Sequence, residues 1–361
     1  MLNFNFLNYV VLTPFIVLIT SLWYFFIKNN FYYVRINPSS TDILKNSKFL
    51  KKVNYNFFTI YFNMMFIYIF IYLFFFKFDF LIYWFNHLKL NNFLINIIII
   101  IFFINILMVG IIKFYKNKNI NFNIDYFFAL FNLGVFIPLM YISNTMYTFI
   151  FLLEANSILI LYKFSVSKYF FKSLKENDKN KFLKNSPRYY INMLFFQYWV
   201  NFFSSIILFI SIFNILLLSG TSEWLMINIL NKFNLNIIFN DNFYFYFFLY
   251  FIFMIGMFFK IGFTPSHLFK IEVYKGIPFI SILFYTIYYF ISFFLYFVII
   301  VFYYINTFKS FVWFFLFIFI IFGLLYIITL MFDVNLLKTF FAYSTVINSL
   351  TFIILLFVSL M

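Results

Sequence analysis

The stretch that decides the fold runs from residue 243 to residue 278 and reads FYFYFFLYFIFMIGMFFKIGFTPSHLFKIEVYKGIP. A helix through this whole stretch would be about 54 Å long at about 1.5 Å per residue, and the hydrocarbon core of a bilayer is about 30 Å thick. Gly262 and Pro265 supply a break. The stretch therefore predicts a membrane helix that is interrupted near Gly262, and such interruptions are tolerated where the backbone lines a cavity.

The composition of the whole chain extends this prediction. Of its 361 residues, 66% are hydrophobic and only 10% are charged, so polar surface could not cover a soluble domain of this length. We predict an all-α fold, a polytopic membrane helix bundle of about ten transmembrane helices with a broken seventh helix. The ten apolar runs lie near 5–27, 56–76, 93–112, 126–143, 146–162, 192–218, 243–263, 279–305, 310–332 and 339–360.

The basic residues test this division of the chain. Loops after the odd-numbered runs hold twenty of the 25 lysines and arginines, loops after the even-numbered runs hold four, and Lys260 lies inside a run. This asymmetry is the positive-inside pattern of a multi-pass membrane protein, and it predicts that both termini lie on the outer face. Membrane topology thus accounts for the net charge of +15, and we expect lipids but no nucleic acid as partners.

Other features of the composition indicate the type of genome that encodes the chain and limit the cofactor and metal sites that it can hold. The 70 phenylalanines and 30 tyrosines, with abundant Ile, Asn and Lys, are typical of a very A/T-rich coding sequence and hence of an organelle genome. The absence of cysteine excludes thiolate metal sites, iron–sulfur clusters and disulfides. Nucleotide-binding glycine motifs are also missing. The sequence thus predicts no cofactor and no metal in this chain.

Two ionisable residues lie inside apolar runs, where a charge costs about 2.5–3.5 kcal/mol on insertion scales and often marks a transport pathway. Glu154 is either a neutral, locally hydrogen-bonded carboxyl or a carrier of protons or cations, because desolvation favours its neutral form and an approaching cation its charged form. Lys260 either extends along its helix toward the basic face or exchanges a proton with water in a cavity at the break. His267, after the break, is a capping residue or a relay member.

Three blocks of the chain, in order, resemble the antiporter-like proton-pumping subunits of respiratory NADH:ubiquinone oxidoreductase. FKIGFTPSHLFKIEVYKGIP at 259–278 resembles their broken seventh helix, and its VYKGIP ending is most similar to subunit 2. Gly134, Asn144 and LLEANSILIL at 152–161 are similar to the fourth and fifth helices. NLLKTFFAYSTVINSL at 335–350 is similar to the basic loop and Ala-Tyr-Ser segment near the end of that pattern.

This resemblance implies a function. Glu154 and Lys260 would be the paired charges of a proton half-channel in the membrane arm of the complex, and electron transfer elsewhere would drive their separation. The candidate relay residues are His267, Tyr288, Tyr289 and Lys338. The chain would be a subunit of a proton-translocating enzyme in the mitochondrial inner membrane, organelle-encoded, with other membrane-arm subunits as partners. NADH, FMN, the iron–sulfur clusters and quinone would bind in other subunits.

The chain departs from the family pattern at two places. The family usually has a second lysine in its eighth helix, and counting from Gly276 places Phe290 there. The family also continues for about four helices beyond the Ala-Tyr-Ser block. We therefore expect the chain to be the N-terminal part of a split subunit 2 whose C-terminal fragment is separately encoded. The single membrane domain would comprise three N-terminal helices at 1–120, a first antiporter-like repeat at 121–305, and the start of a second at 306–361.

Two alternatives to this interpretation stay open. A free-standing cation/proton antiporter would share the broken helix and the buried Glu and Lys, and would exchange ions without NADH. A structural membrane subunit would keep the pair only as packing, with Phe290 marking a degenerate channel.

Overall fold

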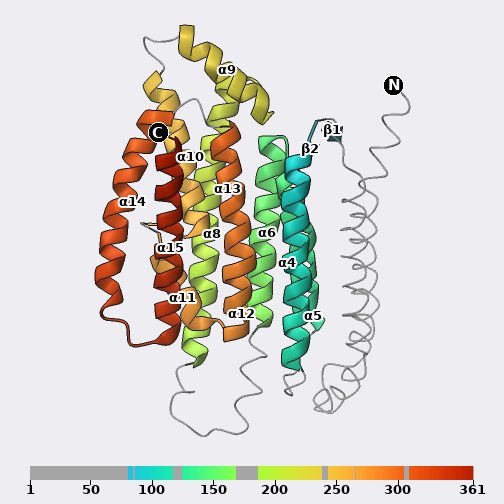
Figure 1. Cartoon of the computed structure of the whole chain (residues 1–361), viewed down its shortest axis with the longest axis vertical. Helices are drawn as coiled ribbons and strands as arrows, with labels where there is room; N and C mark the ends of the chain where they lie inside the picture. Colours follow the sequence, from blue (N-terminus) through green and yellow to red (C-terminus); the bar gives the residue numbers. More distant parts are fainter. Residues whose placement is uncertain are drawn as a thin grey trace, which may run out of the picture. The chain divides into compact units, whose positions relative to one another are not determined.

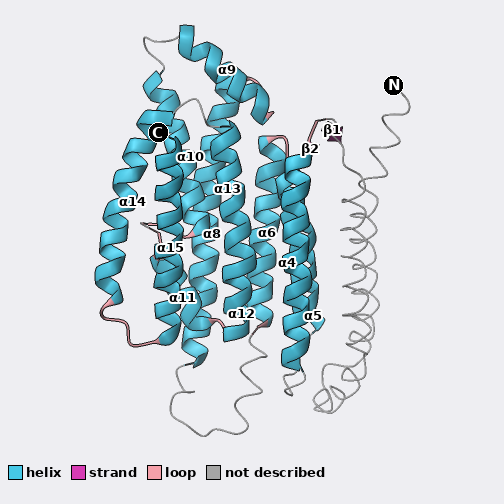
Figure 2. Cartoon of the chain, viewed as in Figure 1, coloured by secondary structure: helices cyan, strands magenta, loops and turns pink. Residues whose placement is uncertain are grey.

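The described parts of the chain are almost entirely helical, with one short β-hairpin (Figure 2). The all-α fold predicted from the sequence is therefore confirmed. The predicted runs at 5–27 and 56–76, and Pro265, lie outside the described residues. The computed structural model describes residues 80–83, 86–116, 124–167, 186–237, 243–264, 266–304 and 309–360.

The chain divides into two compact units, one formed by Met1–Phe85 with Lys89–Ile142 and the other by Asn86–Leu88 with Ser143–Met361. This division falls inside the predicted 121–305 repeat, and the subdivision at 120 and 305 stays a prediction. Strands β1 (Phe80–Tyr83) and β2 (Leu88–Asn91) form the hairpin, whose tip at Asn86–Leu88 belongs to the second unit. In the first unit, α4 (Asn92–Lys116) packs on α5 (Ile124–Ile142).

The second unit is the larger helical bundle (Figure 1). Helix α8 packs along both α10 and α11 and contacts α6, so it forms the spine of this unit. Helices α14 and α15 pack on each other, and α15 also packs on α11. The elements are α6 (Met146–Val166), α8 (Ser186–Ser219), α9 (Trp224–Ile237), α10 (Phe243–Ile261), α11 (Leu268–Gly276), α12 (Phe279–Leu283), the π-helix η2 (Phe284–Phe290), α13 (Ile291–Tyr304), α14 (Lys309–Met331) and α15 (Leu337–Leu360).

Four helices are long and apolar enough to cross a membrane, among the residues that the structure describes. Their apolar spans are Met146–Ser165, Tyr189–Ser219, Ser281–Ile300 and Leu337–Leu355. Helices α4, α5, α10 and α14 contribute shorter apolar segments. Many large apolar side chains on α8 and α14 are exposed, as expected for helices with a face toward lipid.

The interruption predicted after Lys260 is present. Helix α10 ends at Ile261, and Gly262 adopts φ +82°, a left-handed conformation that is strained for residues with a Cβ atom. The backbone N–H groups of Gly262 and Phe263 both donate to the carbonyl oxygen of Phe258, at 2.9 Å and 3.0 Å. These bonds close the helix end, and the chain turns before α11 begins at Leu268.

Two glycines bring neighbouring helices into close contact with the broken helix. A Cβ atom on Gly276 of α11 would collide with Met193 Cβ and would lie 2.7 Å from the backbone oxygen of Tyr189, both on α8. A Cβ atom on Gly323 of α14 would collide with Thr264, inside the interruption. These positions therefore tolerate no side chain without displacement of a neighbour.

We expect Gly276→Val to lower the free energy of unfolding by about 2 kcal/mol, because the added methyl groups meet α8 backbone that cannot rotate away. Unfolding of the purified chain by sodium dodecyl sulfate in mixed micelles measures this. Leu268→Val, on the exposed side of the same helix, is the matched control and should change stability little. Equal stabilities of the two variants would contradict the close approach.

Three elements were not predicted. The 279–305 run was expected as one continuous helix, but seven of its residues form the π-helix η2. Helix α9 was taken as a loop; it buries Trp224 and Ile227 and exposes Leu225, Met226 and Ile229. The hairpin tip was also missed, and it is fixed within the second unit, because Asn144 N–H donates to His87 O at 2.9 Å.

Candidate functional site

Glu154 lies on α6, a helix that starts from a polar cap. The side-chain oxygen of Thr145 accepts a hydrogen bond from the backbone N–H of Thr148, which satisfies a free donor of the first turn. Ser157, one turn after Glu154, donates from its hydroxyl to the Glu154 backbone oxygen at 2.8 Å and to its Oε2 at 3.2 Å. The local hydrogen bonding considered for Glu154 is thus present, and it leaves Oε1 available to another partner.

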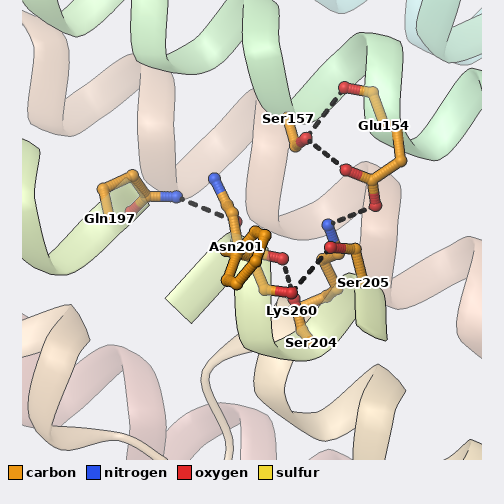
Figure 3. Close-up of polar contacts among 8 residues, drawn as sticks. Glu154, Ser157, Gln197, Asn201, Ser204, Ser205 and Lys260 are labelled. Atoms are coloured by element: carbon orange, nitrogen blue, oxygen red, sulfur yellow. Dashed lines mark hydrogen bonds and ion pairs between the residues drawn. The ribbon is translucent and has the colours of Figure 1, made fainter. Parts of the chain in front are cut away.

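That partner is Lys260. Its Nζ donates to Glu154 Oε1 at 2.8 Å, and the two residues are 106 positions apart in the chain (Figure 3). The Lys260 side chain is fully buried, whereas that of Glu154 is 33% exposed. This burial and pairing favour an amine inside the bundle over one that extends along its helix toward the basic face. Lys260 is in the last turn of α10, directly before the interruption, and this position brings its amine to Glu154.

The energetics of the pair explain why its members depend on each other. A buried ion pair adds little net stability, because the desolvation of two charges offsets their attraction. Removal of Glu154 costs about 3–5 kcal/mol, since the charge of Lys260 is left buried and alone, whereas the Glu154 carboxylate is one-third exposed. Any event that separates Glu154 from Lys260 therefore favours loss of the charge on Lys260.

Helix α8, which packs on both α6 and α10, carries a polar face. Gln197, Asn201 and Ser204 are all nearly inaccessible to solvent, and Figure 3 shows them with Lys260 and Glu154. The Gln197 side chain donates from Nε2 to Asn201 Oδ1 at 3.4 Å, and Ser204 Oγ donates to the Asn201 backbone oxygen at 2.8 Å. Sequence reasoning missed this face, although polar residues at i, i+4 and i+7 in an apolar helix give a recognisable signal.

Several amide atoms of this region have no hydrogen-bond partner among the residues that the structure describes. They are Gln197 Oε1 and Asn201 Nδ2 on the polar face of α8. Both polar atoms of Asn156 also lack a partner, but this residue comes two positions after Glu154 and lies on another side of α6. Buried polar groups of this kind are usually satisfied by water. The surroundings of the ion pair are thus chemically suited to hold water that could carry protons.

The predicted relay residues His267, Tyr288 and Tyr289 belong to two different parts of the fold. His267 is buried at the start of α11, where its side chain makes no capping bond, and its ring contacts that of Tyr326 edge-on at 5.8 Å. Tyr288 and Tyr289 belong to η2, and their side chains lie outside the described residues. The part of these three residues in a relay stays a prediction.

Lys338 has a defined structural role. Its Nζ donates to the backbone oxygens of Ile277 at 2.6 Å and Lys275 at 3.5 Å, at the end of α11. A cation at a helix C-terminus satisfies carbonyl groups that lack intrahelical partners and interacts favourably with the helix dipole. Lys338 therefore joins α15 to the broken helix, whatever its part in a relay.

Three further lysines are buried, although the sequence places them in loops: Lys89 on β2, Lys163 and Lys270. Lys163 lies in the last turn of α6, with its amine over the ring of Phe284, the first residue of η2. Lys270 lies in α11, with its amine 3.8 Å from the ring centre of Phe290, the last residue of η2. The prediction that Lys163 and Lys270 lie in loops is therefore wrong, because α6 continues past residue 162 and α11 forms a helix after the break.

Comparison with known proteins gives one informative match. The chain is 37% identical over 83 residues to an uncharacterized mitochondrial protein, ORF4, of Paramecium tetraurelia. The match covers 23% of this chain and 53% of that protein, so the chain spans about half the length of the curated relative. No family model matches the chain. Together, the match and the apolar helices indicate a mitochondrial membrane protein.

Proposed function

We propose that this chain is a membrane-arm subunit of the mitochondrial NADH:ubiquinone oxidoreductase and contributes a proton half-channel. One observation carries the proposal: Lys260 and Glu154 pair at 2.8 Å, with the lysine fully buried at the end of an interrupted helix. The resemblance of the 259–278 segment to the broken seventh helix of subunit 2 is the reason for assigning the chain to this complex. The chain would be a multi-pass protein of the inner membrane.

The chemistry of the pair suits a proton carrier. While the pair is closed, the Glu154 carboxylate holds Lys260 in its ammonium form, because opposite charges favour each other. When the pair separates, the buried ammonium loses its counter-ion, and its proton passes to a neighbouring water. The Lys260 amine is then neutral, and it takes up another proton before the pair closes again. Electron transfer, with its NADH, FMN, iron–sulfur and quinone cofactors in other subunits, would drive the separation.

Association with the complex is the first property to test. Mitochondrial membranes are solubilised in mild detergent, separated by native electrophoresis, stained in the gel for NADH dehydrogenase activity, and probed with an antibody to this chain. We expect the chain to migrate with the band that oxidises NADH. The predicted C-terminal fragment of subunit 2 should be found in the same band by mass spectrometry.

Two outcomes distinguish the alternatives. A chain that migrates apart from all NADH-oxidising material would reject the proposal and favour a free-standing cation/proton antiporter, which reconstituted vesicles would reveal as ion exchange without NADH. A chain that comigrates but whose ion pair can be replaced without effect on proton uptake would be a structural subunit.

A further inference from the structure

Lys270 is a buried amine that the ion pair does not include. It lies on α11 and is inaccessible to solvent. Its Nζ has no hydrogen-bond partner among the residues that the structure describes. A buried charge without a counter-ion is costly, so this environment favours the neutral amine. Structural lysines usually have a carboxylate or carbonyl partner, as Lys338 has, and packing alone does not explain an amine at this position.

The position of Lys270 is fixed by the interruption itself. A Cβ atom on Gly262 would lie 3.3 Å from Lys270 Cδ, so the lysine stem packs against the bare backbone two residues after Lys260. At its other end the amine lies 3.8 Å from the centre of the Phe290 ring. The Phe290 ring in turn contacts Phe263 edge-on and stacks on Phe294. The glycine and the ring together hold the amine at the broken end of α10.

The ring also gives the protonated form a partner. An ammonium over an aromatic face is attracted by the ring electrons, and more strongly where water is excluded. This attraction offsets part of the cost of charging a buried amine, which brings the neutral and charged forms closer in free energy. A proton carrier requires two such forms. The π-helix that ends at Phe290 is also a local irregularity of a kind often found at functional sites.

We propose that Lys270 is a second proton-carrying residue, which takes the proton that Lys260 releases when its pair with Glu154 opens. The proton leaves the Lys260 ammonium, passes through water and binds the neutral Lys270 amine, so that Lys260 becomes neutral and Lys270 becomes an ammonium. Lys270 later returns this proton to water, Lys260 takes up a new proton from water before its pair with Glu154 closes, and both amines regain their initial forms. This inference rests on the proposed function.

The test compares variants in sealed inner-membrane vesicles that contain the assembled complex, with NADH-driven proton uptake measured per assembled complex. Lys270→Arg keeps the charge and length but holds its proton permanently. Because loss of a positioned acid–base group slows proton transfer about 10²-fold or more, we expect uptake by this variant to fall at least about tenfold. Lys275→Met, which removes an amine paired with Glu272 on the same helix, is the control and should keep uptake.

A relocated lysine separates proton transfer from packing. Proton uptake by Lys270→Met should fall as far as uptake by Lys270→Arg. The double variant Lys270→Met with Phe290→Lys returns an amine to the same site and should regain most of the uptake. Wild-type uptake by Lys270→Arg, or a double variant no better than Lys270→Met, would overturn the inference. Lys260→Met, measured in parallel, tests the proposed function: if it loses uptake while Lys270→Arg does not, only the assignment of Lys270 is wrong.

Discussion

Replacement of Lys260 by Met should slow NADH-driven proton transfer through this chain by about 10²-fold or more, the usual effect of losing a positioned acid–base group. The amine of Lys260 is the buried group that Glu154 holds at 2.8 Å, and a thioether can neither take up nor release a proton. The measurement is proton uptake by sealed inner-membrane vesicles after addition of NADH, normalised to the NADH dehydrogenase stain of the assembled complex.

Lys260→Arg distinguishes a proton carrier from a structural charge. A guanidinium preserves the positive charge and can still pair with the Glu154 carboxylate, but it does not release its proton in proteins. We therefore expect this variant to assemble and to lose proton uptake almost as fully as Lys260→Met. Normal uptake by the arginine variant would show that only the charge at residue 260 matters, and it would favour the structural alternative.

The pairing of Glu154 with Lys260 was predicted from the family resemblance, whereas the residues alone showed only that each is an isolated charge in an apolar run. A buried charge requires a counter-ion, and few are available inside the bundle. The helix break was predictable from the residues themselves, since Gly262 interrupts a stretch too long for one span. These predictions depend on features that are rare in this sequence, namely glycines and charges inside apolar runs, and a rare feature carries a strong signal.

The second amine was harder to find. Lys270 follows the break, in a segment where lysines, a histidine and a glutamate give the composition of a loop. Its burial depends on tertiary contacts, namely the absence of a side chain at Gly262 and the position of Phe290 in another helix. The sequence contains both residues, but it does not show that they meet at one amine.

The π-helix and α9 were missed because hydropathy dominates this sequence. The run from 279 to 305 is almost uniformly aromatic or aliphatic, so its pattern does not distinguish a 3.6-residue period from a wider turn. Helix α9 is short and rich in asparagine, and a search for membrane spans passes over such segments. Uniform apolar composition thus reveals the number of long helices more readily than their irregularities.

The second large effect concerns stability. We expect Glu154→Leu to lower the free energy of unfolding by about 3 kcal/mol, because it leaves the amine of Lys260 buried without its carboxylate. The double variant Glu154→Leu with Lys260→Met removes both charges and should recover most of this loss, since apolar side chains of similar volume replace a buried pair at little cost. Unfolding by sodium dodecyl sulfate in mixed micelles provides the free energies.

Function and stability should therefore separate in this double variant. Its fold should be nearly as stable as that of the wild type, yet proton uptake should be lost, because no ionisable group is left at either position. Glu272→Leu is the control, since its partner Lys275 is partly exposed and can be hydrated when unpaired. A double variant less stable than Glu154→Leu alone would contradict the argument, because the pair would then contribute to stability beyond the cost of an unpaired charge.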